Sequence, residues 1–165
     1  MVRKRALLLL AVGAVVVVVV SSSQGRRSAP GDGCLVVRGG KGLVTLSARG
    51  VVLGRFDQGS VTVDEGLPGG TVKVFGAERR RFISETRTQY IGYDLRFRAS
   101  GQFRVAVSAV FMDISAAGRG VASLAAPDFL EPGTFSVDSE SFCEEGFQPL
   151  PDLPRKLVIG SQSSG

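Results

Sequence analysis

Carboxylate pairs are the residues of this sequence whose spacing would suit acid–base chemistry. The three pairs are Asp64-Glu65, Glu144-Glu145 and Asp138-x-Glu140. Two carboxylates placed across a substrate can act as an acid and as a base or nucleophile in hydrolysis, and several carboxylate oxygens can bind Ca²⁺ weakly. All three pairs lie in or beside polar turns, where carboxylates are solvated. We therefore predict neither a catalytic nor a metal site here, and a carboxylate-dependent hydrolase ranks third among the functions weighed.

Most other catalytic machinery is excluded by the residues that the sequence lacks. It contains no histidine, which removes Ser-His-Asp and Cys-His arrangements and the commonest metal ligand. The two cysteines are too far apart in sequence to suggest a zinc site. The run Gly39-Gly40-Lys41-Gly42 is followed by neither Ser/Thr nor a helix, so it does not fit a phosphate-binding loop. We expect a protein that is not an enzyme and has no cofactor.

Arginines are concentrated in the middle of the sequence and acids near its end. Residues 79–104 hold seven arginines against two acids, and residues 128–152 hold seven acids and no basic residue. One interpretation is that the two segments neutralise each other across a sheet. The other is an arginine-rich face for anionic envelope polymers or phospholipid headgroups. The candidate ligand-binding residues are Arg79, Arg80, Arg81, Arg87, Arg96 and Arg98.

The N-terminal segment, residues 1–23, predicts export from the cytoplasm. Basic residues 3–5 precede residues 6–20, which are all apolar or glycine, a pattern typical of a signal peptide or a transmembrane anchor. With Ser21 to Ser23 the uncharged stretch extends over 6–23, close to the length of roughly 20 residues that crosses a bilayer. We favour an anchor, which makes the cell membrane a partner, and keep secretion after cleavage as the alternative.

The net charge does not indicate a nucleic-acid partner. The whole chain carries a formal charge of +5, but from Gln24 onward there are 17 basic and 15 acidic residues. The basicity therefore belongs largely to the targeting segment and not to a binding surface. Although aromatic residues alternate with the central arginines, as in single-strand binders, an extracytoplasmic protein does not meet nucleic acid. We expect no nucleic-acid partner.

The two cysteines fit an oxidising compartment. A disulfide between Cys34 and Cys143 would close a loop of about 110 residues and contribute roughly 4 to 5 kcal/mol in the chain-entropy model. Two buried free thiols are the alternative. We predict the disulfide.

Alternation of apolar and polar residues predicts strands throughout the region that follows a flexible linker at 24–33. Val61 and Val63 share one face, as do Val72 and Val74. The clearest pattern predicts a hairpin over 93–111 with its turn at 99–101. Its apolar face is expected to hold Tyr93, Leu95 and Phe97 before the turn and Phe103, Val105, Val107, Ala109 and Phe111 after it. The other expected strands cover 34–38, 42–47, 50–56, 60–65, 71–75, 81–86, 120–125, 134–138 and 157–160.

About ten short strands predict an all-β fold over residues 34–165. The expected architecture is a single antiparallel sandwich or barrel-like domain after an N-terminal hydrophobic helix, with a β-solenoid as the rival. Basic-glycine-apolar runs begin at Lys41, Arg49 and Arg119, but the intervals between them are very unequal and do not match a solenoid period. We interpret these runs as recurring turn chemistry.

Several strand-and-turn motifs carry a resemblance to known proteins. The runs are Gln89-Tyr90-Ile91-Gly92, residues 113–122 and Thr134-Phe135-Ser136-Val137. Together with the glycine-rich strands they resemble a loose group of exported bacterial all-β proteins, over roughly residues 34 to 138. The resemblance implies an extracytoplasmic β domain without an assigned activity.

The sequence therefore predicts a binding or structural role at the bacterial cell envelope. The expected partners are the cell membrane and either an anionic envelope polymer or an envelope protein. The alternative role is an accessory or scaffold domain of a larger envelope assembly.

Overall fold

The computed structural model describes residues 32–127, 131–138, 143 and 145–160. The predicted signal or anchor over residues 1–23 and nearly all of the predicted linker lie outside this part. The described part is all-β and forms one antiparallel sheet, which confirms the all-β, antiparallel part of the predicted fold class. Its strands are β1 (Gly33–Asp64), β2 (Thr71–Phe75), β3 (Arg79–Phe82), β4 (Arg87–Ala125), β5 (Thr134–Asp138), β6 (Gln148–Pro149) and β7 (Arg155–Ile159).

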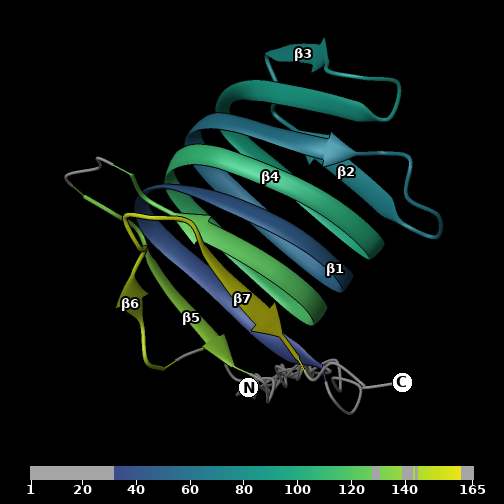
Figure 1. The fold of residues 1–165 in the computed structure, drawn as a ribbon. Coiled ribbons are helices and arrows are strands. Elements are labelled where there is room, and N and C mark those ends of the chain that lie inside the picture. Colours follow the sequence, from purple (N-terminus) through teal and green to yellow (C-terminus); the bar gives the residue numbers. More distant parts are fainter. Residues whose placement is uncertain (1–31, 128–130, 139–142, 144, 161–165) are drawn as a thin grey trace, which may run out of the picture.

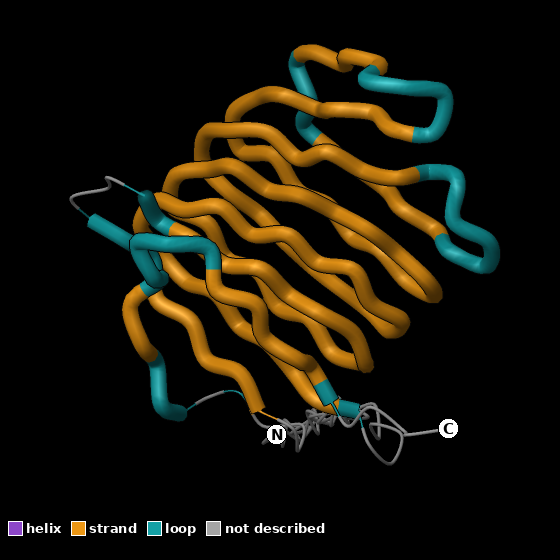
Figure 2. The backbone as a smooth tube through the Cα atoms, viewed as in Figure 1, coloured by secondary structure: helices purple, strands orange, loops and turns teal. Residues whose placement is uncertain are grey.

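Two of these strands are far longer than the sequence suggested, and they pair with each other twice. Thr45 of β1 pairs with Ala106 of β4 on one side and with Ser123 on the other. At every doubly paired position of β1 from Leu43 to Val63, the two partners are separated by the same number of residues along β4. The two strands therefore form an antiparallel ribbon that winds around, so that each turn pairs with the next (Figures 1 and 2).

The short strands complete this winding at its ends. On the first side, which we call the β2 side, the order of neighbouring segments is β2, β4, β1, β4, β1 and β5. On the second, the β3 side, β3 and β7 stand at the two ends and turns of β4 and β1 lie between them. Segments far apart in sequence thus become neighbours on each side.

Alternate residues of both long strands point into the winding and build one core. Val61 and Val63 are fully buried, and Val72 and Val74 pack against the core half-buried, as the alternation predicted. Burial of these apolar side chains is the main favourable term in the free energy of folding. The largest core side chains are Phe56, Phe103, Leu35, Leu46, Leu95, Met112, Ile114, Leu124 and Ile159.

Two backbone kinks reverse the alternation on β4. Asp94 and Phe111 have positive φ angles of 46° and 49°, values that non-glycine residues seldom adopt. Tyr93 and Phe111 are consequently exposed, although the pattern placed both on the inner face. The predicted hairpin with its turn at 99–101 is wrong, because β4 continues straight through these residues.

A row of glycines lets the turns approach closely. Gly118 pairs with Gly33 on one side and with Gly50 on the other, and Gly50 also pairs with Gly101. A Cβ atom at Gly118 would overlap the carbonyl oxygen of Arg49. The predicted strand breaks at these glycines are therefore points where neighbouring backbones meet. The interval from Gly33 to Gly50 equals that from Gly101 to Gly118, so the winding has a sequence period that we did not recognise.

The Cys34–Cys143 disulfide is present, with a Cα–Cα distance of 5.8 Å, and confirms the predicted pairing. Both cysteines are buried and form a small cluster with Val36 and the half-buried Phe147. The bridge ties the first residues of β1 to the segment after β5. It is consistent with an oxidising, extracytoplasmic location.

We predict that Gly118→Ala lowers the free energy of unfolding by about 3 kcal/mol, because strain at its φ of +140° adds to the overlap with Arg49. Gly39→Ala is the control: Gly39 has a φ of +66° but open space around it, so only the backbone term of about 1 kcal/mol is expected. Urea unfolding measures both. An equal loss in the two variants would contradict close packing at the glycine row.

Removing the disulfide should destabilise the protein by about 4 kcal/mol, because the bridge closes a loop spanning 109 residues. The Cys34→Ala/Cys143→Ala variant compared with the oxidised protein in urea unfolding provides the measurement. If the oxidised protein and the variant unfold at the same urea concentration, the bridge does not stabilise the fold.

Candidate anion-binding face

The six arginines proposed from the sequence do not form one surface. Successive side chains of a strand point to opposite faces, so Arg79 and Arg81 of β3 project away from Arg80. Arg80 lies over the rings of Phe82 and Tyr90, with its guanidinium carbon 4.7 and 5.4 Å from the ring centroids. Arg80 is thus engaged by the two rings, one of which packs against the core, although its side chain is still 50% exposed.

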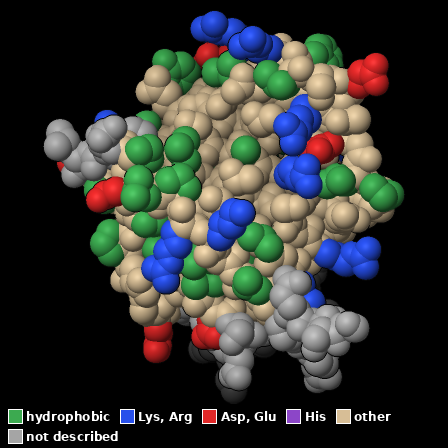
Figure 3. All heavy atoms as spheres, viewed as in Figure 1, with side chains coloured by type: hydrophobic (Ala, Val, Ile, Leu, Met, Phe, Trp, Pro, Cys, Tyr) green, Lys and Arg blue, Asp and Glu red, His purple; other side chains and the backbone are tan. Residues whose placement is uncertain are grey.

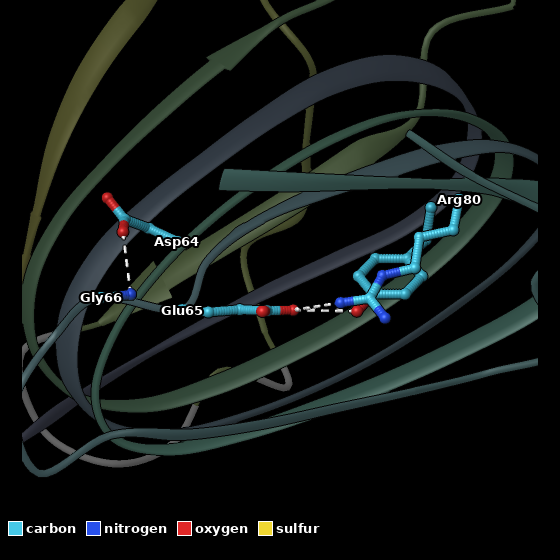
Figure 4. Close-up of polar contacts among 5 residues, drawn as sticks. Asp64, Glu65, Gly66 and Arg80 are labelled. Carbon is cyan, nitrogen blue, oxygen red and sulfur yellow. Dashed lines mark hydrogen bonds and ion pairs between the residues drawn. The ribbon is translucent and has the colours of Figure 1, made fainter. Parts of the chain in front are cut away.

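A small polar network fixes Arg80 in this position. Its guanidinium lies 3.7 Å from the Glu65 carboxylate, and the hydroxyl of Tyr90 donates a hydrogen bond of 2.9 Å to the same carboxylate. Figure 4 shows the Glu65 side chain directed toward Arg80 from the turn after β1. The adjacent Asp64 accepts a hydrogen bond from the backbone of Gly66, which orders that turn.

Arg87 is also engaged. Asp64 lies 3.8 Å from both Arg87 and Arg104, so one largely buried carboxylate is shared by two arginines. The Asp64-Glu65 pair is thus occupied by cations and not directed at a substrate space. The other carboxylate pairs include Glu140 and Glu144, which lie outside the described residues. Within the described residues no group of three or more Cys, Asp or Glu side chains is placed to hold a metal ion.

The remaining two candidates, Arg96 and Arg98, belong to a cationic face on the β2 side. We use this name for Lys73, Arg98, Arg96 and Arg55, which are all exposed. Lys73 of β2 pairs directly with Arg98 of β4, and Arg96 pairs directly with Arg55 of β1. Three separate chain segments therefore contribute to one face.

The cationic face places like charges directly opposite each other in two neighbouring pairs. Such cross-strand pairs are destabilising. Asp113 lies 3.2 Å from Arg55, and Asp94 lies 3.3 Å from Arg96, but exposed ion pairs contribute only about 0 to 1 kcal/mol. Lys73 and Arg98 have no ion pair with any described residue. The Lys73–Arg98 pair is therefore not explained by stability.

Two apolar side chains accompany these cations around a surface hollow. Leu53 and Phe75 are 55% and 54% exposed, and with Arg55, Arg96, Arg98 and Asp113 they line a hollow of about 440 Å³. In the view of Figure 3, basic side chains lie interspersed with hydrophobic ones across the molecular surface. The hollow can therefore contact both an anionic group and an apolar part of a ligand.

Sequence reasoning missed Lys73 and Arg55 as members of this face. The alternation around Val72 and Val74 already directs Lys73 outward. The alternation does not indicate which residue lies opposite each cation on the neighbouring strand. Arg55 lies opposite Arg96 because of the register between the two long, continuous strands β1 and β4. The signal that was present is the regular recurrence of glycine at 33, 50, 101 and 118.

Comparison with protein families, curated proteins and solved structures finds no match to this chain. Among the described residues, no helix has the length and apolar character needed to cross a lipid bilayer. The candidate site therefore rests on its own geometry.

Tyr90 provides a pH test of the polar network. Burial raises the pKa of Tyr90 above its ordinary 10.0, the hydrogen bond and negative charge of Glu65 raise it further, and Arg80 lowers it. Because the folded-state pKa lies above the unfolded value, the stabilisation is fully present below about pH 10 and is lost as the pH rises through the folded-state pKa.

We expect the Tyr93→Phe variant, in which Tyr90 is the one remaining tyrosine, to show a phenolate absorbance midpoint above that of the urea-unfolded chain. Adding Glu65→Gln should lower the midpoint, since the negative acceptor is removed. A midpoint that does not respond to Glu65→Gln would contradict the contact between Glu65 and Tyr90.

Proposed function

We propose that this protein is a binding domain of the bacterial cell envelope whose cationic face holds an anionic envelope polymer. The observation that supports the proposal is the presence of two like-charged cross-strand pairs, Lys73 with Arg98 and Arg55 with Arg96. Lys73 and Arg98, which have no ion pair among the described residues, repel each other and gain free energy when an anion enters between them. A bound polyanion would supply that compensation.

The spacing of the cations favours a ligand with repeated charges. Neighbouring strands lie about 4.8 Å apart, and residues two positions apart on one strand lie about 6.7 Å apart. The cationic face thus offers positive charges at intervals that suit successive phosphate or carboxylate groups of a polymer. Arginine guanidinium groups bind such oxygens in a bidentate manner, and Leu53 and Phe75 can cover the apolar parts of the repeating unit.

The architecture proposed for this domain is the barrel-like form of the predicted antiparallel fold. The wound ribbon has its apolar residues inside and its charged residues outside, and the core is one continuous cluster, which supports that description. We further propose that the chain lies outside the cytoplasm, held by residues 1–23 as a membrane anchor or released after cleavage. The buried disulfide supports the extracytoplasmic location.

A second candidate function is that of an accessory or scaffold domain in an envelope assembly. It is favoured by the edge position of β2, which pairs only with β4 in the described part of the chain. An exposed edge can accept a strand from a partner protein. In either function we propose a binding protein and not an enzyme.

The binding proposal predicts that Lys73→Gln/Arg98→Gln weakens binding of the full chain, in detergent micelles, to polyphosphate or polyglutamate by about tenfold, or about 1.4 kcal/mol. Binding should also weaken with added salt. Stability should change by no more than about 0.5 kcal/mol, because the two cations repel each other. Isothermal titration calorimetry and urea unfolding measure the two quantities.

The matched control is Arg155→Gln/Lys156→Gln on β7, which removes one arginine and one lysine from the β3 side. It should leave binding nearly unchanged. Equal weakening in both variants would show that net charge and not the cationic face attracts the polymer. Unchanged binding in the Lys73/Arg98 variant would rule out the proposed site.

A further inference from the structure

A second hollow lies on the β3 side, toward the end of the winding where β3 stands (Figure 1). Its volume is about 400 Å³, and β1, two passes of β4 and the start of β3 line it. The charged lining residues are one acid and one base, Glu78 and Arg79, so their charges balance. Hydroxyl and amide groups dominate the rest of the lining, which includes Gln58, Ser60, Gln89, Tyr93 and Ser108.

The register of the sheet places the lining side chains on one outward face. Ser60 of β1 pairs with Ile91 on one side and with Ser108 on the other, and Ile91 also pairs with Arg79 of β3. Directly opposite residues of an antiparallel pair have neighbouring side chains on the same face. Four chain segments that are distant in sequence therefore contribute one row of side chains to the hollow.

Two hydrogen bonds hold the amide side chains of the hollow in place. Nε2 of Gln58 donates to the Tyr93 hydroxyl at 3.4 Å, and Nε2 of Gln89 donates to the Ser60 hydroxyl at 3.3 Å. Each of these pairs leaves an amide oxygen as an acceptor and a hydroxyl hydrogen as a donor. The hollow thus offers hydrogen-bond donors and acceptors in ordered positions.

Tyr93 adds an exposed aromatic ring to these polar groups. It is 59% exposed, because the kink at Asp94, with a φ of 46°, reverses the alternation that would direct the ring into the core. The face of such a ring packs against apolar C–H groups, while its hydroxyl keeps a polar partner. The ligand that fits this surface therefore has both a C–H face and polar edges.

The strands beneath the hollow leave no free backbone edge for a peptide. Gly59 of β1 has Gly92 and Ala109 as paired neighbours on its two sides, and Ile91 is likewise paired on both sides. A peptide that adds a strand needs an unpaired edge, and an amphipathic helix needs an apolar groove. Ile91 is the one aliphatic side chain larger than alanine in the lining, and it is half-buried. Neither mode fits this hollow.

We propose that this hollow binds a neutral saccharide, whose ring packs on Tyr93 and whose hydroxyl groups form hydrogen bonds with Gln58 and Gln89. The carboxylate of Glu78 and the guanidinium of Arg79 each present several hydrogen-bonding atoms in one plane, which suits adjacent hydroxyl groups of a sugar. Balanced charge disfavours a polyanion here, and the polar lining disfavours a lipid.

This inference assigns a second surface and an uncharged ligand, so it goes beyond the binding of an anionic polymer. The hollow shares no residue with the cationic face. The two proposals therefore fail independently, and polyphosphate binding should be unchanged when Tyr93 is replaced.

The chain contains no tryptophan, so Tyr93→Trp keeps an aromatic ring at the hollow and adds a single fluorescent probe. Phe111→Trp is the matched control, because Phe111 is 56% exposed and has a φ of 49° but does not line this hollow. The ligands are the uncharged saccharides chitotetraose and cellotetraose. The full chain is kept in phosphocholine micelles, since maltoside detergents carry a sugar.

We expect at least one of the two saccharides to bind at millimolar concentration and to change the emission of the Tyr93→Trp variant, but not that of Phe111→Trp. In calorimetry, Tyr93→Ala should weaken saccharide binding about tenfold, whereas Phe111→Ala should leave it unchanged. Added salt should have no effect, because the ligands carry no charge. Circular dichroism confirms that each variant is folded.

Three results would overturn the proposal. One is the absence of calorimetric binding of both saccharides to the unsubstituted chain at millimolar concentration. Another is equal weakening in Tyr93→Ala and Phe111→Ala, which would assign binding to exposed aromatic rings in general. The third is unaltered saccharide binding in Tyr93→Ala.

Discussion

The structure depends on the double pairing of β1 with β4. Most central residues of β1 have paired neighbours on both sides, and both neighbours come from the same strand, one turn of the winding apart. The winding satisfies the backbone of the long strands internally, which leaves free edges mainly at the short strands. It also requires close approach of successive turns, which glycine at positions 33, 50, 101 and 118 permits. Side chains at those positions would separate the turns.

The antiparallel pairing of β1 with β4 explains how the surface chemistry arises. Cations that are distant in sequence, such as Arg55 and Arg96, become direct neighbours because one strand passes beside the other. The same geometry separates residues that are adjacent in sequence, since Arg80 lies over two aromatic rings while Arg79 and Arg81 project the other way. An arginine-rich segment in the sequence is therefore not an arginine-rich face in the structure. Which side chains share a face depends on the register between paired strands. This register decides whether an arginine contacts other side chains of the protein or is available to a ligand.

The sequence predicted much of the local structure and little of its assembly. Alternation placed Val61 and Val63 in the core, and the compartment argument led to the disulfide, because both follow from local pattern or chain context. Tyr93 and Phe111 were placed wrongly, since kinks at positions 94 and 111 reverse the faces and no local pattern signals a positive φ at aspartate or phenylalanine. Glycines were interpreted as turns because the same permissive backbone serves turns and close strand contacts alike.

The most direct test of this account is disulfide trapping across successive turns. Leu53 and Ser115 are both exposed, and they are neighbours only where one turn of the winding pairs with the next. The Leu53→Cys/Ser115→Cys variant should therefore form an additional disulfide on mild oxidation. Peptide mapping with the native bridge intact detects it. Leu53→Cys/Ser123→Cys, whose positions lie on opposite sides of the winding, should not form one. Failure of the first pair to form a bridge, or equal bridging in both, would contradict the wound ribbon.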